Sequence, residues 1–445
     1  MIKRSITILA LGLGVGAALF IAANLGATRH DSADGPAPVV GASGISGQPR
    51  IPAGGSLDDL IASLQARLNA VPEDYDSWAS LGLAYVQQAK VTVDSTYYPR
   101  ADGALARSLE INDTDNFLAY AGLSALASAR HEFSEARRLA DRGLEINSFS
   151  AILYGALSDA ELQLGNYDEA LAAVQRMVDL SPDMASLSRA SYTWELRGNV
   201  DEARRLMRRA LADAPTAADR AFALVHLGGL SFDEGDANAA LGLYLGALDA
   251  SPTDVSALAG KAKSEAALGQ IETALDDYAT VVTRAPEPGY IVEYARLLES
   301  VGRTDDAVNQ YSAFDATQRL FEANGVEADA TATLVEVDRG NIDVALTAAE
   351  RGVANRPFIA MHDAYAWALH AAGRDHDALA SIDRAMALGT RNASFHYHAG
   401  MISLSLGDID RAQRELITAL DINPAFDPLS ADVAIRTLAS LEATP

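Results

Sequence analysis

The stretch Gly165-Asn166-Tyr167-Asp168-Glu169-Ala170 decides the fold, because it recurs along the chain. It returns as Gly198-Asn199-Val200-Asp201-Glu202-Ala203 and as Gly302-Arg303-Thr304-Asp305-Asp306-Ala307. Weaker copies begin at Gly235, Gly269, Gly340, Gly373 and Gly407, each with an alanine five residues later. Successive glycines are 33, 37, 34, 33, 38, 33 and 34 residues apart, and a fixed period near 34 residues is typical of a helical solenoid.

Each copy reads as the turn of a helix hairpin. Glycine adopts the left-handed conformation that ends a helix. An Asp or Asn two or three residues later, such as Asp168 or Asp201, can accept backbone N–H bonds at the start of the next helix. The alanine is small enough to let two antiparallel helices approach closely.

Composition narrows the class of protein. The chain has 445 residues, with 60 acidic against 35 basic side chains and a formal charge of -25. This balance argues against general nucleic-acid binding, which needs stripes of Lys and Arg. There is no cysteine, so disulfides and thiolate sites are excluded, and the redox compartment stays open.

The N-terminus predicts membrane targeting. Residues 6–23 are apolar apart from Thr7 and follow Lys3 and Arg4, which predicts a cytoplasmic N-terminus with the remainder outside the membrane. The length lies between a secretory signal and a spanning helix, so residues 1–27 are either a single membrane anchor or a cleaved signal, the latter leaving a secreted or periplasmic protein. Residues 28–55 are rich in Gly, Pro, Ala and Ser and predict a flexible linker.

The remainder of the chain resembles a known repeat family. Trp78-x-x-Leu81-Gly82-x-x-Tyr85 matches the tetratricopeptide-repeat (TPR) pattern, and the resemblance runs from about residue 75 to residue 426. It rests on alanines early in the second helices (Ala136, Ala170, Ala203, Ala240, Ala274, Ala307, Ala345, Ala378 and Ala412) and on the prolines that close six repeats (Pro182, Pro215, Pro252, Pro286, Pro357 and Pro424). The C-terminal part looks like many bacterial TPR proteins.

The resemblance implies an all-α TPR solenoid, a right-handed superhelix of about ten helix hairpins. Residues 56–72 predict an N-terminal capping helix that begins at Ser56, residues 73–426 the TPR array, and residues 427–445 a C-terminal capping helix and tail. The first repeat is longer by about seven residues around 91–100. Tyr97 and Tyr98 in that insertion either contact a partner or fold back on their own repeat.

In this family the fifth, ninth and twelfth positions of each first helix line a concave groove. Carried over, those positions assign partner binding to Tyr192, Phe232, Lys263, Arg296, Asp363, Trp367, His370, Tyr397 and Met401, and also include Leu83, Asp159, Glu195 and Glu299. A mixture of aromatic and charged groups suits a peptide with apolar anchors and a few fixed polar contacts. The alternative is that these side chains merely fill a narrow superhelix.

More specific chemistry is not predicted. The chaperone carboxylate clamp of this family needs Lys and Asn where this chain has Ala79 and Leu83. Five of the eight histidines lie between His362 and His398. His396 and His398, however, are about 200° apart around a helix and cannot chelate one metal together. His370 could still meet His398 across neighbouring repeats, but we predict no metal and no cofactor.

No P-loop, dinucleotide fingerprint or nucleophile elbow occurs, and we predict no enzymatic activity. The sequence therefore predicts a non-catalytic scaffold or adaptor that binds a protein or peptide outside the cytoplasm. The alternative is an assembly or maturation factor for envelope proteins or cofactored enzymes.

Overall fold

The computed structural model describes residues 56–327 and 329–442, which are helical and contain no strand. The helices are α1 (Leu57–Ala70), α2 (Tyr75–Thr92), the 3-10 helix η1 (Ser95–Tyr97), α3 (Tyr98–Ile111), α4 (Phe117–Ala129), α5 (Phe133–Ile146), α6 (Ala151–Gln163), α7 (Tyr167–Leu180), α8 (Met184–Leu196), α9 (Val200–Ala212), α10 (Ala217–Asp233), α11 (Ala237–Ala250), α12 (Val255–Ala267), α13 (Ile271–Arg284), α14 (Pro288–Ser300), α15 (Thr304–Ala323), α16 (Ala330–Asp338), α17 (Ile342–Asn355), α18 (Ile359–Ala371), α19 (Asp375–Met386), α20 (Ala393–Ser405), α21 (Ile409–Ile422) and α22 (Ser430–Glu442).

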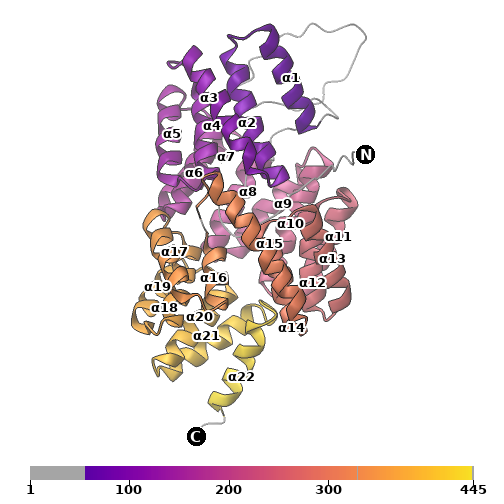
Figure 1. Cartoon of the computed structure of the whole chain (residues 1–445), viewed down its shortest axis with the longest axis vertical. Helices are drawn as coiled ribbons and strands as arrows, with labels where there is room; N and C mark the ends of the chain where they lie inside the picture. Colours follow the sequence, from indigo (N-terminus) through magenta and orange to yellow (C-terminus); the bar gives the residue numbers. More distant parts are fainter. Residues whose placement is uncertain (1–55, 328, 443–445) are drawn as a thin grey trace.

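Helices α2 to α21 pair in chain order as ten hairpins, while α1 covers the first hairpin and α22 follows the last (Figure 1). The prediction of an all-α TPR solenoid with a C-terminal helix is confirmed. Successive first helices also pack on one another, as α4 does on α6 and α18 on α20. The first helices therefore form the inner, concave layer and the second helices the outer layer.

The repeated alanines hold each hairpin together. All nine of the alanines early in the second helices, from Ala136 to Ala412, have 0% exposure. Three of them also accept a buried hydrogen bond from the facing helix: Ser124 Oγ donates to Ala136 O at 2.7 Å, Ser158 Oγ to Ala170 O at 3.1 Å and Ser191 Oγ to Ala203 O at 2.8 Å. A small residue and a short donor therefore face each other where the two helices are closest.

The turn glycines behave as predicted, but the helix caps lie earlier than predicted. Gly165 has φ 75° and ends α6. The next helix begins two residues later, so the N-cap is the residue directly after the glycine. Asn199 caps α9 by accepting from the N–H of Glu202. Asp168 and Asp201 lie inside the first turn instead, where their charge faces the helix dipole.

The superhelix returns on itself after somewhat less than 200 residues. Four hydrogen bonds join residues 191 to 196 positions apart: His131 Nδ1 with Glu327 O (2.9 Å), Ile359 N–H with Tyr167 Oη (2.9 Å), Thr390 Oγ1 with Leu196 O, and Asn423 Nδ2 with Phe232 O (2.8 Å). In Figure 1, α16 to α22 accordingly lie below α3 to α7. The second turn therefore packs directly on the first.

Glycine permits this contact between turns. An added Cβ at Gly198 would lie 2.2 Å from the carbonyl oxygen of Gly389, and one at Gly165 would lie 3.0 Å from that of Pro357. Gly235 is similar, with the carbonyl oxygen of Ile422 at 3.0 Å, whereas Gly269, Gly302, Gly340, Gly373 and Gly407 have nothing within 4 Å of an added Cβ. The same residue type thus closes the first helix of a repeat from Gly165 onward, and it makes room for the neighbouring turn in only some repeats.

Features near the ends complete the description. Tyr97 and Tyr98 pack on the core of their own repeat, which is the second of the two interpretations above. Within the described ranges no helix is both long and apolar enough to cross a membrane. The predicted targeting segment 1–27 and the linker 28–55 lie outside the described residues.

Candidate functional site: the inner surface of the superhelix

The nine predicted binding residues all lie on first helices, from α8 to α20. They do not form one open strip. Phe232, Asp363 and Tyr397 are buried, whereas the other six are partly exposed. Three groups of contacts involve these residues on α12 to α20, and the earlier repeats add further titratable groups.

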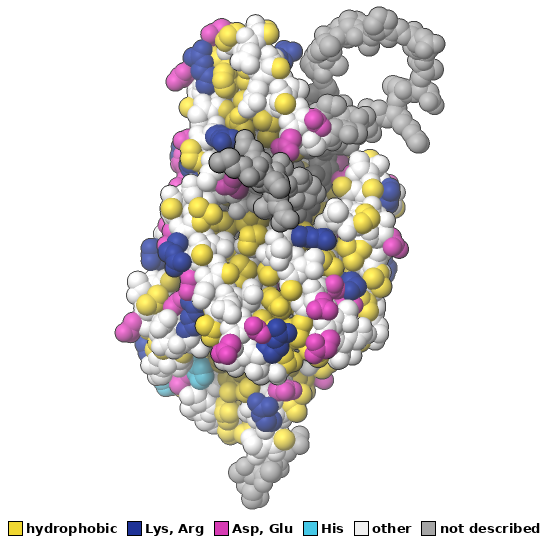
Figure 2. All heavy atoms as spheres, turned by 45° about the vertical axis from the view of Figure 1, so that its right-hand side comes forward, with side chains coloured by type: hydrophobic (Ala, Val, Ile, Leu, Met, Phe, Trp, Pro, Cys, Tyr) yellow, Lys and Arg dark blue, Asp and Glu magenta, His cyan; other side chains and the backbone are white. Residues whose placement is uncertain are grey.

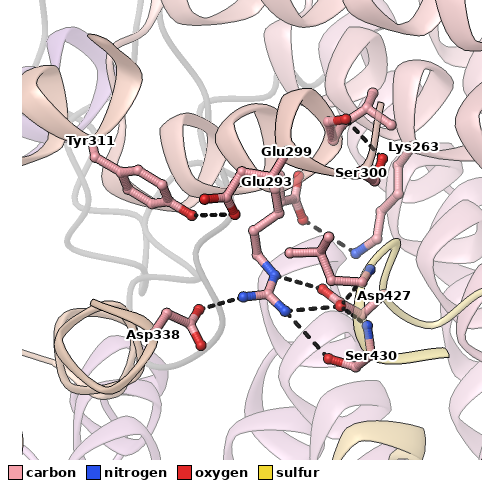
Figure 3. A network of polar contacts seen from close by, with 11 residues as sticks. Lys263, Glu293, Glu299, Ser300, Tyr311, Asp338, Asp427 and Ser430 are labelled. Atoms are coloured by element: carbon pink, nitrogen blue, oxygen red, sulfur yellow. Dashed lines mark hydrogen bonds and ion pairs between the residues drawn. The ribbon is translucent and has the colours of Figure 1, made fainter. Parts of the chain in front are cut away.

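Arg296 is the centre of the first group (Figure 3). It projects from α14, and its guanidinium makes two parallel hydrogen bonds to Asp427, Nε to Oδ2 at 2.7 Å and Nη2 to Oδ1 at 2.8 Å. It also pairs with Asp338 at the end of α16 and donates to Ser430 Oγ at 3.3 Å. Arg296 therefore joins three segments that are far apart in the sequence.

The surroundings of Asp427 favour the ionised form of its carboxylate. Burial acts to raise the pKa of Asp427, but the Arg296 guanidinium and the bonds from Ser430 outweigh it and lower the pKa to about 2. Burial likewise raises the pKa of Asp338, against the opposing effect of Arg296. Side-chain exposure is 18% for both Arg296 and Asp427, so the pair is largely shielded from water and from screening by salt.

Lys263 on α12 is the centre of the second group. Its ammonium is 3.2 Å from Glu293 Oε1 and lies 5.0 Å from the centre of the Phe232 ring. The Glu293 charge raises the pKa of Lys263 in spite of burial. Glu293 also accepts from Tyr278 Oη at 3.2 Å, so this carboxylate is held from two sides.

Aromatic rings make the third group, on α18 and α20. Trp367 stacks on His398 with ring centres 4.2 Å apart, and lies 5.8 Å from Tyr397 and 5.0 Å from His370. Asp363 fixes the His398 ring through Nδ1 at 2.7 Å. Trp367 and Met401 pack against the core that Tyr397 shares with α21 and α22.

The histidines do not converge. His370 and His398 contact Trp367, while His370 bonds to Asp375 at 2.5 Å and His396 to Glu415 at 2.7 Å. Each ring thus has a carboxylate partner of its own, so the expected meeting of His370 with His398 is mediated by Trp367. In residues 56–327 and 329–442, no group of three His, Asp or Glu side chains is arranged to hold a metal ion.

The earlier repeats line the same surface with titratable groups. Arg189 holds Asp159 by two bonds, of 3.0 Å and 2.8 Å. Burial, together with the charge of Asp233, raises the pKa of Glu195 to about 8. Burial lowers the pKa of Lys90 to about 8. These shifts show that water solvates this part of the inner surface poorly.

Sequence reasoning missed Asp338, Phe426 and Asp427. The first ends a helix, and the other two lie in the turn before α22, so none occupies a groove position of a repeat. Asp427 and Arg296 are 131 residues apart, which leaves no local signal for this pair. The face in Figure 2 carries Lys and Arg side chains singly or in small groups among Asp and Glu.

Comparison with known proteins identifies the repeats. A family model described as tetratricopeptide repeat matches residues 120–185 and 197–255, and a second of the same description matches residues 393–426. No curated protein matches the chain in sequence.

Solved structures with a similar fold include human IFIT1 (14% identity, 83% of this chain and 87% of that one, TM-score 0.47). Another is yeast Tom70 (14% identity, 87% and 92%, TM-score 0.34). A third is a tetratricopeptide repeat protein from Parabacteroides merdae (21% identity, 58% and 98%, TM-score 0.35). Each TM-score is below 0.5, and the ligands of these proteins therefore say nothing about what this chain binds. The chain carries tetratricopeptide repeats within residues 120–185, 197–255 and 393–426.

Proposed function

We propose that the chain is a non-catalytic scaffold that binds an extended segment of a protein partner on the inner surface of its superhelix. Tetratricopeptide repeats generally mediate interactions between proteins. The observation that carries the proposal is the chemistry of that surface. The first helices carry partly exposed Trp367 and Met401 and, on other repeats, two cations, Lys263 and Arg296, that are oriented by carboxylates. Aromatic anchors with a few oriented charges are the usual means of holding a peptide.

The test compares inner and outer positions. The full chain, tagged at its C-terminus, is purified from crosslinked cells with the partners it retains. Trp367→Ala with Lys263→Ala should release a partner that wild type retains. Ile417→Ala on the outer helix α21, where the side chain is 47% exposed, should retain it. A partner that survives the inner substitutions and is lost with the outer one contradicts the proposal.

We further propose that the scaffold lies outside the cytoplasm, held to the membrane by residues 1–27. The support is the apolar run that follows Lys3 and Arg4. The alternative is export with cleavage of the same segment. Deleting residues 1–27 should give a protein that stays in the cytoplasm, is recovered without detergent and keeps its helical circular dichroism. Unchanged fractionation with membranes contradicts the anchor, and the N-terminal sequence of the mature protein separates anchor from cleaved signal.

A further inference from the structure

The turn between α21 and α22 crosses the superhelix and lies against the inner surface. The ring of Phe426 is 5.7 Å from that of Tyr397, and it packs in the cluster that also holds Trp367 and Met401. The next residue, Asp427, receives the two parallel bonds from Arg296. Two consecutive side chains of this segment thus make an aromatic contact and an ion pair: Phe426 with Tyr397, and Asp427 with Arg296.

The partners of this segment are residues that the TPR pattern itself assigns to ligand binding. Arg296, Trp367, Tyr397 and Met401 all lie at groove positions of first helices. Trp367, Tyr397 and Met401 come from α18 and α20, close in sequence to this segment, whereas Arg296 on α14 is 131 residues from Asp427. In Figure 3, Asp427 and Ser430 lie next to each other where the chain enters α22, and Asp338 lies apart from them on another segment. The segment therefore meets the inner surface as a peptide ligand would.

The contact is of the kind that recognises a carboxylate. A guanidinium that donates two parallel bonds to one carboxylate discriminates by geometry as well as by charge. Asp427 is further held by the N–H groups of Leu429 (3.0 Å) and Ser430 (2.7 Å), so its carboxylate is presented in a fixed orientation. Aromatic contact and ion pair together define a two-residue motif, an aromatic residue followed by an acidic one.

We propose that Phe426 and Asp427 occupy the binding site of the scaffold from within, and that its external ligand is a peptide with an aromatic residue directly followed by Asp or Glu. This proposal rests on the function proposed above and specifies the partner. A tethered segment competes at an effective concentration on the order of 1 mM. We call a variant whose own Phe426 and Asp427 no longer fill the site the opened variant. A peptide in solution therefore binds the wild-type chain more weakly than the opened variant, by about tenfold or more when the intrinsic Kd of the peptide is below about 0.1 mM.

The test uses a fluorescent peptide with the sequence of residues 423–430, Asn-Pro-Ala-Phe-Asp-Pro-Leu-Ser. Anisotropy is measured against the full chain and against the full chain carrying Phe426→Ala and Asp427→Ala. The opened variant should bind the peptide at least about tenfold tighter than wild type. A peptide in which Ala replaces both Phe and Asp should not bind.

Two further variants localise the binding. Arg296→Ala in the opened chain should abolish it, whereas Arg138→Ala, an arginine on α5 that pairs with Glu135, should not. Should the opened variant fail to fold, Asp427→Asn keeps an oxygen for the N–H groups of Leu429 and Ser430 while removing the charge. It should also bind the peptide more tightly than wild type does.

Equal binding of the two peptides, or no binding by a folded opened chain, overturns the proposal. The scaffold function itself is judged separately, by the loss of a cellular partner with Trp367→Ala and Lys263→Ala. If those substitutions release the partner while the peptide fails to bind, the motif is wrong and the scaffold stands. If they do not, the inner surface is not the binding site.

Discussion

Gly198→Ala tests whether the two turns of the superhelix are in contact, with Gly302→Ala as its matched control. Both glycines follow a first helix and have positive φ, 70° and 76°. Each substitution places an L side chain in the left-handed region, at a cost of about 1–2 kcal/mol. At Gly302 the added Cβ meets nothing within 4 Å, whereas at Gly198 it lies 2.2 Å from the carbonyl oxygen of Gly389.

The difference between the variants therefore measures the contact between turns. Cβ contacts below about 3 Å do not occur, so the turn around Gly389 must move by roughly 1 Å, and overpacking of this kind costs about 1–3 kcal/mol more. The bond that Thr390 donates to the carbonyl of Leu196 lies in the same contact and should weaken with it. The free energy of unfolding should thus fall by about 1–2 kcal/mol for Gly302→Ala and by about 2–5 kcal/mol for Gly198→Ala.

Urea unfolding followed by circular dichroism gives the two free energies. Because a repeat array can unfold in stages, amide hydrogen exchange is used to measure which residues lose protection in each variant. Exchange should rise around residues 196–199 and 389–392 in Gly198→Ala and stay at the wild-type rate there in Gly302→Ala. Equal destabilisation by the two alanine variants, with no change in hydrogen exchange at residues 389–392, would refute the contact between the two turns of the superhelix.

Three more predictions follow from particular contacts. Asn423→Ala removes the buried bond from Nδ2 to the carbonyl of Phe232 and should lower stability by about 1–2 kcal/mol; a melting curve identical to wild type speaks against this contact. Ala203→Leu inserts a large side chain at a position with 0% exposure and should cost about 1–3 kcal/mol in urea unfolding; full tolerance would mean that the hairpin is not closely packed there. Glu195 has a pKa raised to about 8 from 4.5 by burial and by Asp233, so the folded state holds a proton that the unfolded state loses above pH 4.5. Its contribution to stability is therefore present at low pH and is lost as pH rises to about 8. Glu195→Gln should raise the melting temperature at pH 8 and have little effect at pH 4.5, and an effect independent of pH would argue against the shift.

The hairpins could be predicted because each depends on residues close in sequence. Gly165 and Ala170 are five residues apart, and their roles, ending one helix and admitting the next, are local. The caps were placed too late, because Asn166 and Asp168 are both competent N-caps and the pattern does not choose between them. The structure chooses the residue directly after the glycine, since α7 begins at Tyr167.

The candidate site could be predicted only in part. The groove positions named Arg296, Trp367 and Tyr397, and their role in binding stays a prediction. They did not show that Asp427 pairs with Arg296 or that Phe426 lies beside Tyr397. The pair between Asp427 and Arg296 depends on where the last repeat comes to lie after the small rotations of the repeats before it, whereas the contact of Phe426 with Tyr397 is made within the last repeat.

The sequence by itself determined the repeating hairpin, its period and the inner face of its first helices, because glycine turns and buried alanines act within a repeat and on its neighbour. Tertiary structure alone decided that the superhelix touches itself, that Gly198 needs to be small for a second reason, and that the inner surface already holds Phe426 and Asp427. The physical reason is accumulation: each hairpin rotates slightly on the last, and contacts across 191 to 196 residues record the sum of those rotations, which no single repeat encodes.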